Sequence, residues 1–476
     1  MSSVLDNKVA KEKCQKFTSS DIVQTMLNLA GYTQNLAGHP VLENSFGSGN
    51  ILTAIVKRYI DSCLAVGMTL DAISKGLSKD IYGIELDSVL FALCKEKLNT
   101  IVTAYNLPPV DWHLYNCDGL FWNDSQLQFD YIIGNPPYIV YKEIDKNNQS
   151  LLREKFSSCS EGKFDYCYAF IESAINMLSS NGKLVQLIPS NIYKNVYGKN
   201  LRTILKDHIA VIYDYPSQNL FESTLTSSSI FLYDKSCNSP VVRYQNFTED
   251  QDIQVLRSTL ADKWMFSASM TDSLQSIQFG QLFHASISVA TQLNDAFVVS
   301  ESTLSENALE KEIIRPAISP RSMRYKRKEF IIFPYKYING ELTRFPEEQF
   351  ELLFPNVCSY LKQNLSKLNE RKKDSSAAWF EYGRSQALKH LNQEKMLLST
   401  IVTNRVETCQ LDSETIPYSG IYITVKDSRY SLKDAERILK SKAFFEYVEK
   451  VGIRINGKSI RITCKDINNF NIVWGE

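Results

Sequence analysis

The sequence lacks the patterns typical of metal-binding, disulfide-bonded and membrane proteins. Its ten cysteines include no Cys-x-x-Cys pair and its five histidines are scattered, so we expect no metal site and reduced thiols. It has no apolar run near the roughly 20 residues that span a membrane, and no charged-then-apolar leader. We therefore expect a cytoplasmic protein with neither a membrane span nor a secretion signal.

The chain also lacks a net charge of either sign. Its 53 basic residues balance its 53 acidic residues, unlike the strongly basic composition of many nucleic-acid-binding proteins. Any contact with nucleic acid must therefore come from local clusters of lysine and arginine. With 44% hydrophobic and 22% charged residues over 476 positions, the composition is that of a globular protein long enough for two or three domains.

The most informative segment is Asp130-Tyr-Ile-Ile-Gly-Asn-Pro-Pro-Tyr138. Its apolar first half predicts a buried parallel strand, and the two prolines must end that strand in a rigid, extended turn. Ligands of open α/β sheets bind at the carboxyl ends of strands. Asn135 offers an amide that can donate and accept, and Tyr138 offers a flat aromatic face. The pair therefore suits a planar group that carries an NH2.

Three acidic side chains follow successive predicted strands in a strand–helix rhythm. Glu43 ends a strand over 40–43 and precedes the glycine turn Gly47-Ser48-Gly49, which lets a ligand approach the backbone. Glu85 ends the next strand, over 80–85, where a carboxylate typically holds ribose hydroxyls. Asp118 follows a third strand over 110–115. These spacings predict the opening half of a dinucleotide-type α/β fold.

The remaining elements of this half are predicted from periodicity and turn residues. Helices are expected over 22–29, 50–59, 87–104, 164–178 and 198–207, and a polar loop over 142–162. Further strands are expected over 183–188, 209–214 and 227–234, the last of which ends the sheet. Phe221 lies in the loop between the last two strands.

The order of these motifs resembles the gamma-class DNA adenine-N6 methyltransferases of restriction–modification systems, the TaqI-like type. The resemblance covers the first half closely and continues as a looser pattern through most of the second half. Asn44 and Phe46 stand where the family has proline and a small residue, which makes the glycine turn bulkier. The motifs that carry it are Phe17-Thr18, Glu43-Asn-Ser-Phe-Gly47-Ser-Gly49, Gly83-Ile-Glu85, Asp118, Asn135-Pro-Pro-Tyr138 and Gly182-Lys-Leu-Val-Gln-Leu-Ile-Pro189.

The resemblance implies a Rossmann-like S-adenosylmethionine-dependent methyltransferase domain. Thr18 and Glu43 would contact the methionine end of this cofactor, beside the turn from Gly47 to Gly49. Glu85 would hold the ribose hydroxyls and Asp118 the adenine amine, with Phe170 near the purine.

The resemblance also implies how the target is held. Asn135 and the Pro136 carbonyl would accept from the adenine NH2, while Tyr138 and Phe221 would stack on the two faces of a flipped-out base. Two acceptors below the NH2 favour a geometry closer to tetrahedral, which frees its lone pair for the methyl group. No strong base is required, because the proton can leave after transfer.

The second half is predicted to find the DNA sequence. We expect a catalytic domain over 1–236 and an α+β target-recognition domain over 237–476. A helix over 432–449 is interpreted as a packing element. Three clusters of basic side chains are predicted to contact phosphates: Arg315, Arg321, Arg324, Lys326 and Arg327; Arg371, Lys372 and Lys373; and Arg454 and Lys458.

Competing hypotheses share the Asn-Pro-Pro-Tyr motif. An RNA adenine-N6 methyltransferase carries it, and so does a protein-glutamine methyltransferase, which would be much shorter at its C-terminus. A catalytically inactive DNA-binding subunit is a further alternative. The chain shows no nuclease constellation and begins almost directly at the cofactor domain, so we expect a modification enzyme that acts as a monomer on double-stranded DNA. Any cognate restriction endonuclease would be a separate protein.

Overall fold

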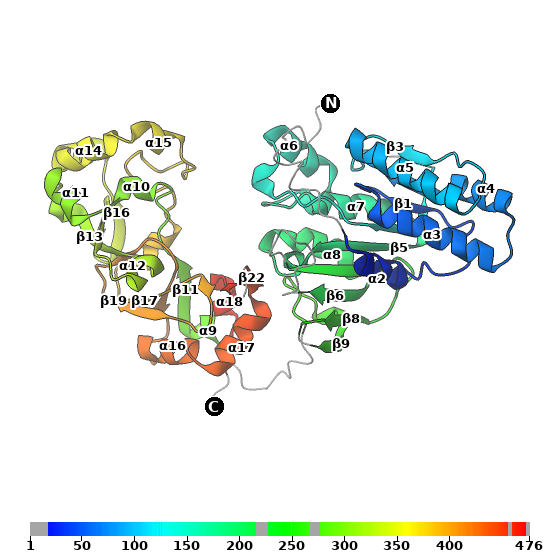
Figure 1. The fold of residues 1–476 in the computed structure, drawn as a ribbon. Coiled ribbons are helices and arrows are strands. Elements are labelled where there is room, and N and C mark those ends of the chain that lie inside the picture. Colours follow the sequence, from blue (N-terminus) through cyan, green and yellow to red (C-terminus); the bar gives the residue numbers. More distant parts are fainter. Residues whose placement is uncertain are drawn as a thin grey trace. The chain divides into compact units, whose positions relative to one another are not determined.

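A computed structural model describes residues 18–122, 124, 126–215, 227–248, 250–266, 277–455 and 459–472. The chain divides into two compact units, an N-terminal unit over 1–270 and a C-terminal unit over 271–476. Figure 1 shows both, coloured along the sequence. Among the described residues, no helix is long and apolar enough to cross a membrane.

One large mixed sheet forms the centre of the N-terminal unit. Among the described residues its order is β3-β2-β1-β4-β5-β7-β6-β8-β9. Strands β3, β2, β1, β4 and β5 are parallel, β7 runs antiparallel to both β5 and β6, and β9 is antiparallel to β8. The strands are β1 (Val41–Glu43), β2 (Ile81–Ile84), β3 (His113–Tyr115), β4 (Phe129–Gly134), β5 (Leu178–Pro189), β6 (Ile209–Tyr215), β7 (Ser228–Asp234), β8 (Val241–Asn246) and β9 (Gln251–Leu256).

The strand order reverses between β1 and β4. From β1 the chain adds β2 and β3 on one side, and then returns to place β4 on the other side of β1. In an open α/β sheet, a crevice forms outside the carboxyl ends of the strands at such a switch point. The predicted Rossmann-like fold is confirmed, and the predicted motif at the end of β4 lies where a ligand crevice is expected.

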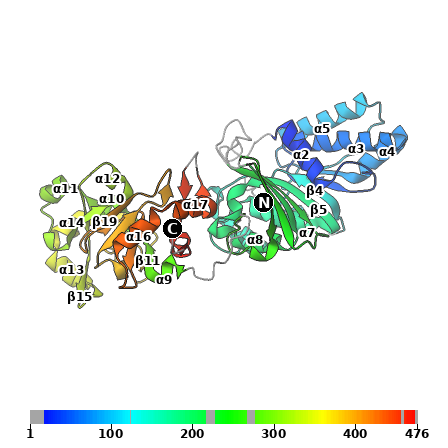
Figure 2. The same ribbon diagram turned by 90° about the horizontal axis from the view of Figure 1, so that it is seen from below.

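Helices cover both faces of this sheet (Figure 2). One face buries α2, α3, α4 and α5 against residues such as Val41, Ile133 and Val185. The other buries α7 and α8 against Leu42, Ile132 and Leu184. The helices are α2 (Ser20–Ala30), α3 (Asn50–Ala65), α4 (Leu70–Asp80), α5 (Ser88–Ala104), α6 (Lys146–Lys155), α7 (Cys167–Met177) and α8 (Lys199–Lys206).

Two predictions for this unit are wrong. The segment 142–162, expected to be a loop, contains helix α6, whose N-terminus is capped because the Asp145 carboxylate accepts from the Asn148 N–H at 3.0 Å. The sheet does not end at 234, because β8 pairs with β6 and β9 pairs with β8. The compact unit therefore extends past the predicted boundary at residue 236 to Met270.

The C-terminal unit combines small sheets with short helices around two apolar clusters. Strands β11 (Phe283–Ile287), β21 (Ile421–Val425), β17 (Lys395–Leu398) and β19 (Thr408–Leu411) form one four-stranded sheet, in that order. A second contains β12 (Val298–Val299), β14 (Glu329–Ile332), β13 (Ile314–Ile318) and β20 (Ile416–Pro417). This mixture agrees with the α+β prediction.

Shorter strands and helices complete this unit. The strands are β10 (Ile277–Gln278), β15 (Tyr335–Ile338), β16 (Glu341–Arg344), β18 (Ile401–Val402), β22 (Ile453–Arg454), β23 (Ile460–Arg461) and β24 (Asn471–Ile472). The helices are α9 (Phe279–Leu282), α10 (Asn294–Phe297), α11 (Glu301–Glu306), α12 (Pro320–Arg324), α13 (Glu347–Leu353), α14 (Pro355–Lys362), α15 (Leu365–Glu370), α16 (Leu432–Leu439), α17 (Lys442–Val451) and α18 (Cys464–Asn468).

The single helix predicted over 432–449 is two helices. Helix α16 ends before Lys440, and Ser441 starts α17 by accepting from the Phe444 N–H at 3.1 Å. A serine that caps a helix must itself leave helical geometry, which explains the break. Both helices bury apolar side chains, as the prediction of a packing role requires.

Candidate active site

A pocket opens at the switch point between β1 and β4. We call it the switch-point pocket; its lining includes side chains from the loops that follow β1, β2, β3 and β4, together with α7. Nine residues that the sequence singled out meet there: Thr18, Glu43, Gly47, Glu85, Asp118, Asn135, Pro136, Tyr138 and Phe170. The predicted acids and the predicted Asn-Pro-Pro-Tyr loop therefore share one cavity.

The glycine turn requires glycine at two positions. Gly47 and Gly49 have φ angles of 54° and 84°, in the left-handed region that side chains disfavour. A Cβ atom at Gly49 would also overlap the sulfur of Cys94 on α5. Gly49 directly precedes α3, so the turn leads the chain from β1 into that helix while keeping the backbone close to the pocket.

Glu43 brings a buried carboxylate to the end of β1. Its side chain is 2% exposed, and its Oε2 atom has no hydrogen-bond partner among the described residues. Burial raises the pKa of this carboxyl well above its ordinary value; the Leu52 N–H opposes the rise, and the nearby Glu85 adds to it. A buried acceptor without a donor is costly, so the site is suited to a ligand that supplies a cationic N–H group.

The other two acids are held by backbone N–H groups. Glu85 accepts from the Gly47 N–H and the Asp87 N–H, both at 2.8 Å. Asp118 accepts from the Leu120 N–H at 3.0 Å. Burial raises the pKa of both carboxyls, although these N–H groups oppose the shift. Each carboxylate is therefore fixed in orientation while it faces the pocket.

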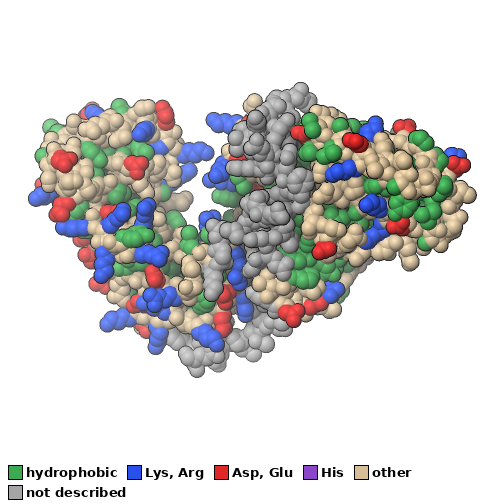
Figure 3. Space-filling view, in the orientation of Figure 1, with side chains coloured by type: hydrophobic (Ala, Val, Ile, Leu, Met, Phe, Trp, Pro, Cys, Tyr) green, Lys and Arg blue, Asp and Glu red, His purple; other side chains and the backbone are tan. Residues whose placement is uncertain are grey.

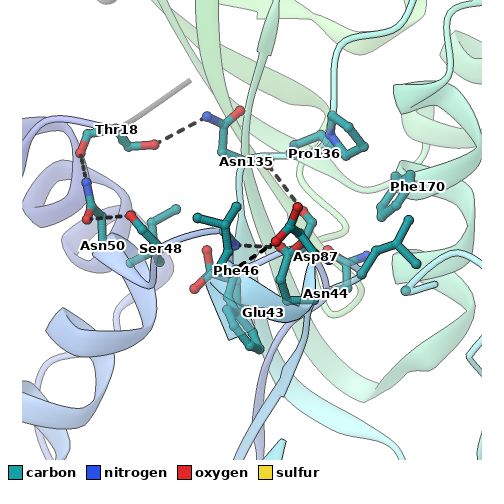
Figure 4. A pocket seen from close by; sticks show the side chains of 18 of the residues that line it. Thr18, Glu43, Asn44, Phe46, Ser48, Asn50, Asp87, Asn135, Pro136 and Phe170 are labelled. Carbon is teal, nitrogen blue, oxygen red and sulfur yellow. Dashed lines mark hydrogen bonds between the residues drawn. The ribbon is translucent and has the colours of Figure 1, made fainter. Parts of the chain in front are cut away.

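Asn135 is oriented by Thr18. Its Nδ2 donates to Thr18 Oγ1 at 3.3 Å, and Asn50 in turn donates to the Thr18 carbonyl at 3.2 Å (Figure 4). The backbone of the loop is held as well, because Ser45 Oγ donates to the Asn135 carbonyl at 3.2 Å. Tyr138 is tied to β5, since its hydroxyl donates to the Leu187 carbonyl at 2.7 Å. An amide and an aromatic ring are thus fixed on one rigid loop.

Several lining residues were not predicted as site residues. Asn44 is 2% exposed, and neither of its amide atoms has a hydrogen-bond partner among the described residues. Asp87 caps α5, and an aspartate just before a run with helical apolar periodicity is the signal that predicts such a cap. Tyr166 lies beside Phe170, with 5.4 Å between ring centroids. The bulk of Phe46 is accommodated because it lies beside Gly83 and packs on Phe91.

The predicted phosphate-binding residues fall into different surroundings. Arg321, Arg324, Lys326, Arg327 and Lys372 are exposed on the C-terminal unit, whereas Lys373 and Arg454 are partly buried. Arg315 lies 2.9 Å from Glu414 in an ion pair. Phe221 and Lys458 lie outside the described residues.

Arg371 contradicts its predicted role. Its guanidinium donates to the carbonyls of Leu368 at 3.1 Å, Thr291 at 2.6 Å and Trp379 at 3.0 Å, and also to that of Glu381. Four of its five N–H donors are thereby engaged inside the protein. Arg371 is a structural residue that joins separate segments of chain, and these four donors are not available to phosphate.

The sequence matches one family model and several characterised proteins. The matching model describes the Eco57I restriction-modification methylase, over residues 79–221. The type II methyltransferase M.BstVI of Geobacillus stearothermophilus is 22% identical, over 96% of this chain and 89% of its own length. The enzyme RM.Eco57I of Escherichia coli, named a type II restriction enzyme and methyltransferase, is 25% identical over 67% of this chain but only 37% of its own length.

A solved structure has a similar fold. The type IIL restriction–modification enzyme MmeI, determined in complex with DNA, matches 94% of this chain with a TM-score of 0.62 and 13% identity. This chain spans 64% of the MmeI chain. S-adenosylmethionine is the cofactor that the methylase match implies, and the pocket fits it, because Glu43 presents a buried acceptor without a donor. The predicted resemblance is therefore confirmed: this chain is similar to the methyltransferases of type II restriction–modification systems.

Proposed function

We propose that this protein transfers a methyl group from S-adenosylmethionine to N6 of an adenine in double-stranded DNA. The observation that carries the proposal is the Asn135-Pro-Pro-Tyr138 loop, which lines the same pocket as the orphaned Glu43 carboxylate. The acceptors for a target amine and the acceptor for a cationic cofactor group then lie in one cavity. A cavity that holds both the methyl donor and the target amine is suited to methyl transfer, and not only to binding one ligand.

The Asn135 loop holds the target amine. The Asn135 side-chain oxygen and the Pro136 carbonyl accept its two N–H groups, and Thr18 fixes the amide by accepting from Nδ2. This orientation draws the nitrogen lone pair out of conjugation with the ring and toward the methyl group. Positioning supplies much of the remaining acceleration, because reacting atoms must come within about 3–3.5 Å in line.

Residues of the strand ends hold the cofactor, which supplies a methyl group activated by a positively charged sulfur. Glu43 and Thr18 bind its methionine end beside the turn formed by Gly47 and Gly49. Glu85 accepts from its ribose hydroxyls. Asp118 accepts from its adenine amine, and Phe170 packs on the purine.

The target base must leave the DNA stack to reach the loop. Extrusion of a base costs a few kcal/mol, and stacking on an aromatic ring returns about 1–3 kcal/mol per base. The ring of Tyr138 is suited to this because its hydroxyl is fixed to β5. Phe221 is proposed for the opposite face of the base.

The C-terminal unit is proposed to recognise the DNA sequence. Its exposed basic side chains, Arg321, Arg324, Lys326 and Arg327 among them, supply phosphate contacts. M.BstVI, which is named a type II methyltransferase, aligns with 96% of this chain and so with most of this unit as well. We propose that the protein acts as a monomer in the cytoplasm, and that any cognate restriction endonuclease is a separate chain.

The test is methyl transfer from tritiated S-adenosylmethionine to unmethylated genomic DNA, with bulk RNA as a parallel substrate. Label recovered from DNA as N6-methyladenine, and its loss in the Asn135→Ala variant, is the expected result. Label in RNA alone would establish the RNA methyltransferase instead. Absence of label together with absence of cofactor binding would favour an inactive DNA-binding subunit.

A further inference from the structure

A basic groove crosses one face of the C-terminal unit. It consists of two adjoining hollows that share Met323, Arg324 and residues 404–407. One wall is α12 and the residue after it, Tyr325; the other is the loop between β18 and β19. The junction of α16 and α17 extends the groove. In Figure 3, lysine and arginine side chains gather where Figure 1 places α12, β17, β19 and α16.

The charge of the groove is strongly one-sided. Of its charged lining residues only Glu407 is acidic, whereas five are basic: Arg321, Arg324, Arg405, Lys440 and Lys442. Arg321 and Arg324 form no ion pair with any residue that the structure describes. Lys440 and Lys442 are paired with Glu436 at 2.6 Å and with Glu446 at 3.6 Å, so Arg321 and Arg324 contribute most of the positive charge of the groove. A groove of this kind attracts an anionic partner.

The loop over 403–405 lies at the edge of the groove and is anchored at both ends by buried residues. Val402 and Val406 flank it and are 2% and 5% exposed, with both side chains in the apolar cluster below. Thr403, Asn404 and Arg405 are exposed between them. Arg405 forms an exposed ion pair with Glu407, with 3.4 Å between Nη2 and Oε1. The Asn404 amide makes no hydrogen bond within the described part of the chain, so donor and acceptor are both available.

The opposite wall is also rigid. Helix α12 begins with Pro320 and a capping box, in which Ser319 accepts from the Ser322 N–H at 3.0 Å and Ser322 accepts from the Ser319 N–H at 2.8 Å. Both serines are buried. Arg321 and Arg324 therefore extend from a helix whose N-terminus is capped. Tyr325 beside them is 62% exposed.

We propose that this groove holds the double-stranded DNA substrate of the proposed function, with Arg321 and Arg324 on phosphates and with Asn404 and Arg405 on base edges. An asparagine amide pairs with the N6 and N7 atoms of adenine, and an arginine guanidinium pairs with O6 and N7 of guanine. These are the two side-chain types that the loop presents. An acidic protein segment would be held by the charges alone and would give Asn404 no function.

The test uses the full-length protein and four single variants. Arg324→Ala removes a phosphate contact, whereas Asn404→Ala and Arg405→Ala remove base contacts. Arg437→Ala is the matched control, because Arg437 is exposed on α16 and does not line the groove. Each variant is first checked for an unchanged thermal melting curve. DNA affinity is then measured against salt concentration, and methylated positions are mapped on genomic DNA.

The two kinds of residue predict different results. Arg324→Ala should weaken DNA binding similarly for all sequences and reduce the slope of log affinity against log salt by about 1. Asn404→Ala and Arg405→Ala should each relax the methylated sequence at one base position, with a loss of discrimination of about 5- to 100-fold. Arg437→Ala should match the wild type in both measurements.

The outcomes separate this proposal from the proposed function. If the wild type methylates DNA and all four variants retain its salt slope and its methylated sequence, the groove does not hold the DNA and the inference is wrong. If the wild type methylates no DNA, the proposed function itself fails. Affinity loss in Arg324→Ala without any change of sequence in Asn404→Ala or Arg405→Ala would overturn the assignment of base contacts.

Discussion

The switch-point pocket and the basic groove differ in how the chain assembles them. The lining of the pocket comes largely from the residues that directly follow β1, β2, β3 and β4, so the topology of one parallel sheet brings them together. The groove takes α12, the 403–407 loop and the junction of α16 and α17, which are separated by long stretches of sequence. A pocket at strand ends can therefore be predicted from spacing, whereas a surface groove depends on tertiary packing.

Arg324 and Arg371 illustrate the difference within one unit. Both belong to basic clusters in the sequence, and both were predicted to bind phosphate. Arg324 is exposed in the groove, but Arg371 donates to four carbonyls inside the protein. A cluster of basic residues in the sequence therefore shows that positive charge is present. It does not show whether each side chain faces solvent or the protein interior.

The largest effect is expected in the pocket, from Asn135→Ala. Removal of one preorganised polar group that faces the reacting atom should lower the rate of methyl transfer by roughly 10²–10³-fold. Cofactor affinity should stay close to that of the wild type, because the main cofactor contacts are assigned to Glu43, Glu85 and Asp118. Single-turnover transfer and calorimetric binding measure the two quantities. A parallel loss of cofactor affinity would place Asn135 in the cofactor site instead.

Arg371→Ala should produce the opposite pattern, in which stability falls without a change in specificity. It leaves several partly buried carbonyls without donors, at about 1–3 kcal/mol for each group that finds no other donor. We expect the free energy of unfolding to fall by roughly 2–4 kcal/mol, measured by urea denaturation. At temperatures where the variant is folded, its salt slope for DNA binding should equal that of the wild type. A reduced salt slope would show that Arg371 contacts DNA phosphates after all.

Part of the fold and of the pocket can be predicted from the sequence alone. The strands up to β7 and the pocket residues Glu43, Gly47, Glu85, Asp118, Asn135 and Tyr138 follow from short-range signals: apolar runs, glycine turns, acids at strand ends and the rigid turn after β4. The site roles of Thr18, Pro136 and Phe170 came only from the family resemblance. Strands β8 and β9 were assigned to the wrong unit, because a strand's sequence does not tell which sheet it joins. The break at Ser441 depends on a local cap, and the hydrogen bonds of Arg371 to Thr291 depend on a distant segment; helical periodicity encodes neither.

Glu43→Gln should weaken cofactor binding without disturbing the fold. Glutamine keeps the shape of the side chain but loses the charge that a cationic group requires. A hydrogen bond to a charged group contributes about 1.5–3 kcal/mol, so affinity should fall by about 10- to 100-fold. Isothermal titration with S-adenosylmethionine measures the loss. Unchanged affinity would show that the orphaned Oε2 atom does not contact the cofactor.

The pH dependence of the same residue gives a smaller and more specific effect. Burial raises the pKa of Glu43 above its ordinary value of 4.5 in the free protein, and a cationic ligand would lower that pKa again. Cofactor affinity should therefore increase with pH until the pH passes the raised pKa of Glu43 in the free protein, and it should stay constant above that pH. The stability of the free protein should change in the opposite direction, because the native state favours protonated Glu43, and this contribution is lost as the pH passes the raised pKa. Both slopes should be reduced in Glu43→Gln.

The smallest expected effect compares two buried amides, one inside the pocket and one outside it. Asn44 lines the pocket and Gln186 pairs with Gly134 within the sheet, and neither amide has a hydrogen-bond partner among the described residues. Replacement of an unpartnered buried polar group by an apolar group of similar shape is neutral or stabilising. Asn44→Leu and Gln186→Leu should therefore each raise the unfolding free energy of the free protein, by about 1 kcal/mol.

Only one of the two variants should change the affinity for the cofactor. Asn44→Leu changes the wall of the pocket and should reduce cofactor affinity several-fold, whereas Gln186→Leu should leave affinity unchanged, because Gln186 does not line the pocket. Thermal melting with and without S-adenosylmethionine measures both effects on the same samples. A lower melting temperature for free Asn44→Leu would mean that the amide supports the fold. Asn44 would then stabilise the turn after β1 and would not contribute to ligand binding.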